Sequence, residues 1–160
     1  MLARIDDFER HLQAGRASAH TRAAYRRALT RFAGFMHEQL ELEDWSQADV
    51  RAVELYLLHL ASAGRSPRTQ AQHLAALRTF FDYLVRQKVI TANPARLVTN
   101  PKQPQPLPGA LDVEQTQKLL SGFDDSWEGI RDRAMMELLY ASGMRVAELA
   151  SLTVADGRAL

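Results

Sequence analysis

Apolar residues recur at helical spacing along most of this chain, and that spacing constrains its fold more than any other feature. No stretch alternates between apolar and polar residues with the period of two that a half-buried strand requires. In the second predicted helix, for example, the side chains on one stripe are Tyr25, Leu29, Phe32 and Met36. The sequence therefore predicts an all-α fold over most of its length.

Capping residues mark the ends of the predicted helices. Ser46 is placed as the N-cap of the third helix, and Ser66-Pro67 is the serine-then-proline pair that suits the start of the fourth. Gly64 ends the third helix. We expect the first four helices, which close a small bundle, over about residues 2–14, 18–40, 46–64 and 66–87.

A proline-rich stretch divides the chain. Residues 100–109 hold four prolines within ten residues, which is typical of an extended linker. In the part that follows, Asp112 with Gln115 three residues later indicates a capping box that opens a helix to about residue 120. Gly143 ends another helix, and a short helical turn follows. The sequence therefore predicts a helical domain over residues 1–99, a linker over 100–109 and part of a second domain over 110–160.

Positive charge is concentrated on one segment. Between Arg16 and His37 there are five arginines and no acid, whereas Glu38 to Glu54 hold six acids against the single Arg51. A phosphate-binding surface leaves this footprint. A solvated helix face in an arginine-rich chain is the other interpretation, since the sequence has 17 Arg and 3 Lys.

Several classes of protein are disfavoured by what the sequence lacks. It has no cysteine, which excludes disulfides and thiolate metal sites, and its five histidines show no His-x-x-x-His pairing, so no metal is expected. The first ten residues mix acids and arginines, unlike a signal peptide, and no run of about 18 apolar residues indicates a membrane span. We therefore expect a cytoplasmic protein with no membrane partner.

Two regions carry a resemblance to a known family. The first comprises Ser18–Tyr25 and Ser66–Phe81, and the second is Arg131–Leu149. In this order they resemble the tyrosine site-specific recombinases of the phage integrase family, specifically the bacterial Xer group. The second region is the more specific, because its Tyr-x-Ser-Gly-x-Arg-x-x-Glu-Leu pattern closely follows the first catalytic box of the family.

The resemblance implies an architecture and a set of partners. A four-helix SAM-like core-binding domain is followed by a linker and by the first helices of an incomplete tyrosine-recombinase catalytic domain. The two domains of such a protein clamp duplex DNA at a recombination site, and a paired recombinase subunit joins them in a tetrameric synaptic complex. The implied processes are chromosome dimer resolution, with roles in chromosome partition and cell division, or DNA integration.

The resemblance also implies a chemistry, of which this sequence holds only one part. A tyrosine attacks the scissile phosphate to give a 3′-phosphotyrosine link, with neither a metal nor a nucleotide cofactor, while positively charged groups stabilise the transition state. Arg145 matches the first catalytic arginine, and its forked guanidinium suits bidentate contact with phosphate. Glu148 matches the acid that holds the catalytic groups in place. The lysine hairpin, the His-x-x-Arg box and the nucleophile are missing, so we expect DNA binding without cleavage.

Two side chains on the fourth predicted helix are candidates for reading bases. Arg68 and Gln72 are four residues apart and face away from the apolar stripe, so both can reach one groove of DNA. The resemblance places this helix in the major groove, where Arg68 suits guanine and Gln72 suits adenine. An ordinary polar helix face is the other interpretation.

Four further residues are candidate phosphate contacts. Arg27 and Arg31 face outward from the second helix, where a solvated face is the alternative. Thr21 and Thr69 lie near helix starts and resemble family positions that touch phosphate, with plain N-capping as the alternative.

Apolar residues give two further expectations. Each tyrosine is expected in a core rather than as a nucleophile: Tyr25, Tyr56, Tyr83 and Tyr140. An apolar patch is expected to stay exposed in the second domain, formed by Met135, Met136, Leu138, Leu139, Leu149 and Leu152.

A competing hypothesis for the whole chain is a non-enzymatic helical protein-interaction module, because four-helix bundles serve many purposes and a fold does not by itself fix a function.

Overall fold

The computed structural model describes residues 1–102 and 109–157. Each of its two longest helices begins at a serine whose hydroxyl group caps the helix. The Ser18 hydroxyl accepts a hydrogen bond from the Thr21 amide (3.1 Å) at the start of α2 (Ala19–Leu40). The Ser66 hydroxyl accepts one from the Thr69 amide (3.2 Å) at the start of α4 (Pro67–Arg86). The described residues form helices, turns and coil with no strand, so the predicted all-α fold is confirmed.

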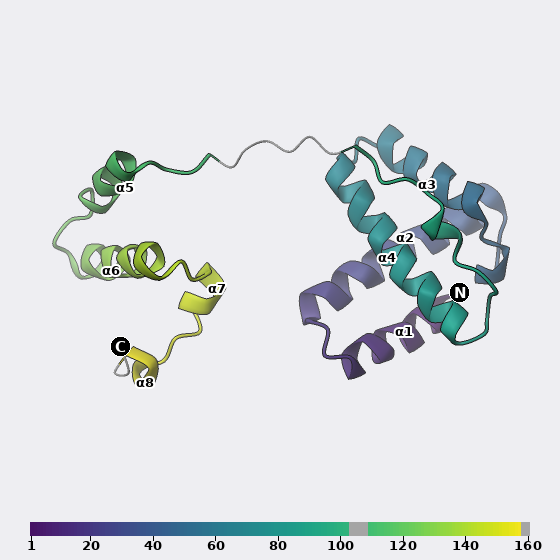
Figure 1. The fold of residues 1–160 in the computed structure, drawn as a ribbon, viewed down its shortest axis with the longest axis horizontal. Helices are drawn as coiled ribbons and strands as arrows, with labels where there is room; N and C mark the ends of the chain where they lie inside the picture. Colours follow the sequence, from purple (N-terminus) through teal and green to yellow (C-terminus); the bar gives the residue numbers. More distant parts are fainter. Residues whose placement is uncertain (103–108, 158–160) are drawn as a thin grey trace. The chain divides into compact units, whose positions relative to one another are not determined.

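The chain divides into two compact units, Met1–Gln105 and Pro106–Leu160. The domain boundaries drawn from the sequence stay a prediction, and residues 103–108 of the expected linker lie outside the described residues. Besides α2 and α4, the first unit contains α1 (Leu2–Ala14), the 3₁₀ turn η1 (Trp45–Gln47), α3 (Val50–Ser62) and the 3₁₀ turn η2 (Pro94–Arg96) (Figure 1). The second contains α5 (Val113–Leu120), α6 (Trp127–Ser142), α7 (Val146–Leu149) and α8 (Val154–Gly157).

An aromatic core holds the first unit together. α2 packs against α1, α3 and α4, and α4 also packs against α3 and η2. The Phe32 ring lies 4.9 Å from that of Tyr56, and the Trp45 ring lies 4.6 Å from that of Phe80, each measured between ring centroids. All four side chains are fully buried. Burial of this much aromatic surface is the main source of stability for the unit.

Ser46 is not the N-cap that the sequence suggested. Its hydroxyl and its amide both donate to the Asp44 carboxylate, at 2.6 and 2.9 Å, and this closes η1. Asp49 caps α3 instead, by accepting a hydrogen bond from the Ala52 amide at 2.8 Å. The prediction was wrong because Asp44, two residues earlier, engages Ser46, and a better acceptor stands three residues later.

Arg78 of α4 holds the segment that follows this helix against it by hydrogen bonds. Its guanidinium donates three hydrogen bonds, to the carbonyl oxygens of Ala95 (3.1 Å) and Val98 (2.6 Å) and to the side chain of Asn100 (3.1 Å). Ala95 and Val98 are buried, so their carbonyl groups need protein partners. Arg78 therefore fixes the path of the chain as far as Asn100.

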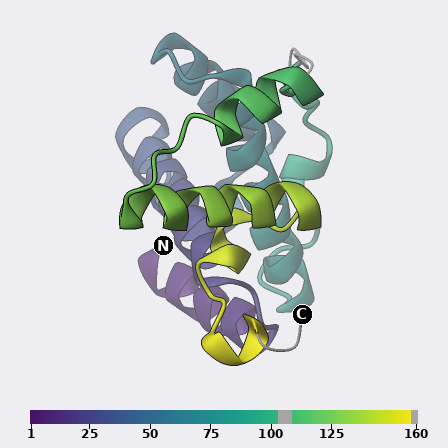
Figure 2. The ribbon, with the colours of Figure 1, turned by 90° about the vertical axis from the view of Figure 1, so that its left-hand side faces the viewer.

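The second unit has well-formed helices but few buried side chains. Figure 2 shows α5 above α6, with α7 and α8 below them, and α6 packs against both α5 and α7. Among its described residues only Thr116 and Gly129 are buried. Of the apolar patch expected here, Met135 and Leu152 are exposed, at 37% and 40%, and the other four residues are half-buried.

The four tyrosines do not share one environment. Tyr56 and Tyr83 are buried and Tyr25 packs against the core of the first unit, as expected. Tyr140 is 61% exposed, so its assignment to a core was wrong. Among the described elements, α6 packs against α5 and α7, and this packing leaves most of the Tyr140 side chain uncovered. No helix among the residues described is both long and apolar enough to cross a membrane.

Candidate nucleic-acid interface

α2 and α4 begin in the same way, with a serine followed three residues later by a threonine. In each pair the serine is the N-cap, and the two hydroxyl groups are hydrogen-bonded to each other, at 2.9 Å for Ser18 with Thr21 and 3.0 Å for Ser66 with Thr69. Neither threonine is itself the N-cap, but each is a hydrogen-bond partner of the capping serine, so capping and phosphate contact both stay open as roles for these residues. Each helix thus presents two hydroxyl groups at its positive end, where an anion is favoured.

The outer face of α4 carries the two candidate base-reading side chains. Arg68 and Gln72 are exposed, on the opposite side from the buried Leu74 and Leu77. Within the residues that the structure describes, neither side chain has a hydrogen-bond or ion-pair partner. Both are free to contact a ligand, as their spacing predicts, while their role in reading bases stays a prediction.

The arginines of α2 fall into two groups, which the sequence did not distinguish. Arg26 pairs with Asp6 (2.7 Å) and Glu9 (2.5 Å) on α1, and hydrogen bonds to these carboxylates raise its pKa above the ordinary value. Arg22 donates to the side chain of Gln13 at 3.2 Å. These two arginines therefore hold α1 and α2 together, Arg26 through two acids of α1 and Arg22 through the amide of Gln13.

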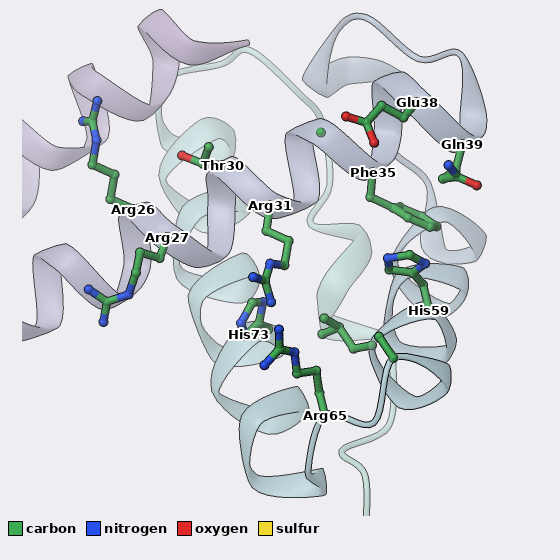
Figure 3. Close-up of a pocket in the computed structure, with 13 residues that line it drawn as sticks. Arg26, Arg27, Thr30, Arg31, Phe35, Glu38, Gln39, His59, Arg65 and His73 are labelled. Carbon is green, nitrogen blue, oxygen red and sulfur yellow. The ribbon is translucent and has the colours of Figure 1, made fainter.

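The second group is Arg27 and Arg31, which are exposed and form no ion pair with any described residue. Both line a groove of about 900 Å³ between α2, α3 and α4 (Figure 3). Its apolar wall includes Phe35 and Leu60, and it is also lined by His59, Arg65 and His73. The sequence placed Arg27 and Arg31 on one outward face, and the structure brings Arg65 and His73 to the same side of the unit.

His73 is held by a hydrogen bond from the core. Its Nδ1 lies 2.8 Å from the hydroxyl of Tyr56, and burial raises the pKa of Tyr56 above its ordinary value. Burial lowers the pKa of His73, and the nearby charges of Arg31 and Arg65 lower it further. Sequence analysis missed this cluster because its residues come from three elements. The only local signal was the position of Arg65, one residue before the cap of α4.

Arg145 and Glu148 lie in the second unit, at the start of α7. The Arg145 guanidinium donates to the Glu148 carboxylate at 2.9 Å, and the Arg145 amide donates to the same carboxylate at 2.7 Å. The two side chains are 84% and 53% exposed. Glu148 thus holds both the backbone and the guanidinium of Arg145, which fits the positioning role that the resemblance implies, although the catalytic roles of both residues stay predictions.

Two protein-family models match the chain. Residues 5–88 match the model described as the phage integrase N-terminal SAM-like domain, and residues 110–159 match the phage integrase family. The first match alone spans more than half of the chain and covers α2 and α4 completely.

Among curated proteins, the chain is similar to tyrosine recombinases. It is 40% identical over 147 residues to tyrosine recombinase XerC of Chromohalobacter salexigens, covering 91% of this chain and 49% of that protein. It is also 40% identical over 154 residues to tyrosine recombinase XerD of Listeria monocytogenes, covering 95% of this chain and 52% of that protein. The chain therefore spans about half the length of the curated relatives it matches.

One solved structure has a similar fold. The integrase from mycobacterium phage Brujita superposes with a TM-score of 0.57 at 22% sequence identity, over 90% of this chain and 46% of that one. At this identity the likeness supports the fold.

Proposed function

The chain belongs to the phage integrase family of tyrosine recombinases, and from that premise we propose that its first unit binds duplex DNA during site-specific recombination. One observation carries the proposal. The candidate contact residues lie on α2 and α4, the two helices that begin with the same serine–threonine pair. The exposed cations Arg27, Arg31 and Arg68 of these helices have no acidic partner in the described part of the chain.

We assign two kinds of contact to this surface. Arg27 and Arg31 bind backbone phosphates, as do Thr21 and Thr69 through their hydroxyl groups at the helix starts. Arg68 and Gln72 read base edges in the major groove, since arginine suits the two acceptors of guanine and glutamine suits the edge of adenine.

The likeness to proteins named XerC and XerD supports a wider role. We assign the chain to recombination at a specific DNA site, in chromosome dimer resolution with its links to chromosome partition and cell division, or in DNA integration. It acts in the cytoplasm, and it pairs with a second recombinase subunit in a tetrameric complex on DNA. These 160 residues hold only Arg145 and Glu148 of the catalytic groups, so by themselves they do not cleave DNA.

Titration of a labelled duplex by the 160-residue chain at two salt concentrations tests the proposal. Each phosphate contact releases counterions, and the logarithm of the binding constant falls with the logarithm of salt by about 0.9 per contact. We expect a steep loss of affinity between low and moderate salt. A helical protein-interaction module, the competing hypothesis, predicts either no binding or no dependence on salt.

A pair of variants separates the two kinds of contact. Arg68→Ala is expected to cost about 1–3 kcal/mol on a preferred sequence and to relax the preference at one base pair. Arg27→Ala is expected to weaken all sequences alike. Binding measured on a panel of single-base-pair changes gives both results. A uniform loss in both variants would show that Arg68 does not read a base.

A further inference from the structure

The groove between α2, α3 and α4 gathers positive charge at one place. Figure 3 shows the side chains of Arg31, Arg65 and His73 converging there from α2, from the turn before α4 and from α4 itself. Within the described residues, neither Arg31 nor Arg65 pairs with a carboxylate. Glu38 is the acidic residue that lines the groove, and in Figure 3 it lies away from this cluster.

The groups of this cluster are held in place by the fold. The Arg65 amide donates to the carbonyl of Leu60 at 2.9 Å, and the side chain of Gln70, itself buried, donates to the Arg65 carbonyl at 2.9 Å. His73 is oriented by the hydroxyl of Tyr56. Arg31 lies on α2, and the opposite face of this helix packs into the core. The backbone positions of Arg31 and Arg65 and the ring of His73 are therefore set before a ligand arrives, which lowers part of the entropic cost of binding.

We propose that Arg31, Arg65 and His73 together bind one phosphate group in this groove. The inference rests on the proposed function and deepens it, because Arg65 and His73 join Arg31 on a single phosphate. The ligand chemistry is a phosphate oxyanion, which a phosphodiester of DNA or free inorganic phosphate can supply. Two guanidinium groups offer forked donors that match phosphate oxygens.

The imidazole supplies a further donor. The Tyr56 hydroxyl stays protonated because burial raises its pKa, so it can donate to Nδ1 of His73 and leave the ring proton on Nε2. The groups that face His73 are Arg31 on α2, Tyr56 on α3 and Arg65 before α4. A bound phosphate offsets the repulsion from the two arginines and so raises the pKa of His73. Binding therefore takes up a proton, and affinity increases as the pH falls.

The first arm of the test uses duplex DNA. Arg31→Gln and Arg65→Gln are each expected to weaken binding about threefold to tenfold on every sequence and to lower the salt slope by about 0.9. Arg51→Gln, an exposed arginine of α3 outside the groove, is the matched control and is expected to leave both quantities unchanged. Thermal unfolding of each variant verifies that the fold is intact.

The second arm follows the imidazole of His73 by NMR in the full 160-residue chain, with and without DNA and with and without inorganic phosphate. The pKa of His73 is expected to rise when either ligand binds. His59 lines the same groove beside Phe35, at 5.0 Å between ring centroids, and serves as the internal control that should move less.

The two arms separate failure of the site from failure of the proposed function. If DNA binds but Arg65→Gln behaves like Arg51→Gln and the pKa of His73 does not move, the phosphate site is wrong and the proposed function stands. If DNA does not bind but inorganic phosphate raises the pKa of His73, the site stands with free phosphate as its ligand and the proposed function fails. If neither ligand moves the pKa of His73, the site is overturned whatever the affinities are.

Discussion

The two units of this chain use the same local signals and reach different degrees of packing. α4 in the first unit and α6 in the second both begin at a serine N-cap, and both run for 16 or more residues. α4 buries eight of its residues, whereas α6 buries only Gly129. Caps and helix propensity therefore set where a helix begins and ends, while partners far away in the sequence decide whether its apolar face is covered.

The difference extends to what each unit offers a ligand. In the first unit most of the large apolar residues are buried, and the exposed side chains of α2 and α4 include arginines with no acidic partner among the described residues. In the second unit large apolar residues such as Trp127, Ile130 and Tyr140 are more than half exposed. The first unit thus combines a packed core with exposed arginines on its surface. The second has helices whose apolar faces are still available for packing.

The two tryptophans give the sharpest test of this comparison, since each unit has one. Trp45 is 1% exposed and its indole N–H donates to the Met1 carbonyl at 3.1 Å, whereas Trp127 is 75% exposed. We expect Trp45→Ala to lower the free energy of unfolding of the first unit by about 3–5 kcal/mol. Trp127→Ala is expected to change it by less than about 0.5 kcal/mol.

Chemical denaturation followed by circular dichroism measures both changes. Each single-tryptophan variant also reports its own environment, because a buried indole emits at shorter wavelength and is shielded from quenchers. If Trp45→Ala and Trp127→Ala lowered the free energy of unfolding equally, the distinction between a packed first unit and an open second unit would be wrong.

Arg78 tests how far the order of the first unit extends along the chain. Arg78→Met keeps an unbranched apolar stem but removes the guanidinium, which leaves the buried carbonyl groups of Ala95 and Val98 without their donor. The expected cost is about 2–3 kcal/mol, because hydrogen bonds from a charged group are lost and buried acceptors stay unsatisfied. Arg86→Met, at the exposed end of α4, is the control and should cost less than about 0.5 kcal/mol.

Hydrogen exchange locates the effect of Arg78→Met. Amides of η2 should lose protection in this variant more than amides of α2, since the guanidinium contacts only the segment that follows α4. Uniform loss across the unit would mean that Arg78 supports the core rather than the path of this segment.

Two glycine-to-alanine substitutions, one in a helix of each unit, are expected to change stability in opposite directions. At Gly129 a Cβ atom would meet the backbone oxygen of Asp124 too closely, so Gly129→Ala is expected to destabilise the start of α6 by about 1–3 kcal/mol. At Gly34, inside α2, the nearest atom to a new Cβ is the Glu38 carboxylate at 3.9 Å. Gly34→Ala is expected to stabilise the first unit by about 0.5–1 kcal/mol through helix propensity.

The two glycine variants need different measurements. Thermal unfolding of the first unit reports Gly34→Ala, and amide exchange in α6 reports Gly129→Ala. If amide exchange in α6 is unchanged in Gly129→Ala, the loop at Asp124 moves easily to make room for the new Cβ atom. The second unit would then be packed less rigidly than its few buried side chains indicate.

Much of the fold could be predicted from local chemistry. The serine cap at Ser66 and the capping box of Asp112 with Gln115 are where the sequence placed them. These signals act over three or four residues, so the sequence shows them directly. The prediction that Ser46 is an N-cap was wrong because of an interaction over the same short range. Asp44, two residues earlier, accepts a hydrogen bond from the Ser46 hydroxyl.

What could not be predicted depends on contacts between elements. The sequence could not assign Arg26 to Asp6 and Glu9 on another helix, and so it could not separate the arginines that hold α1 from those that face solvent. Tyr140 lies beside an apolar stripe like the buried tyrosines, yet packing against α5 and α7 leaves most of its side chain uncovered. The groove with His73 arises only where three helices converge. Periodicity gives the face of a helix but not its partner.

A further test concerns Arg145 and asks whether the second unit contributes to catalysis in this chain. Cleavage in this family requires a nucleophile in line with the leaving oxygen, and groups that act as a unit lose nearly all function when one is removed. In the proposed assignment Arg145 and its ion-pair partner Glu148 are the catalytic groups within these 160 residues, without the further positive groups or the nucleophile. Arg145 alone can help to neutralise a bound phosphate, which assists binding without lowering the chemical barrier.

Arg145→Ala should therefore change DNA affinity by no more than about 1 kcal/mol, as a surface phosphate contact would. Cleavage should be absent with and without the substitution, when the chain is incubated with a nicked recombination-site duplex and the products are resolved on a denaturing gel. A loss of affinity larger than that of Arg27→Ala would mean that Arg145 contributes more to binding than Arg27, and would count against the first unit as the main DNA contact. A covalent protein–DNA species that survives denaturation would point to a nucleophile among the four tyrosines, with the exposed Tyr140 as the first to replace by phenylalanine.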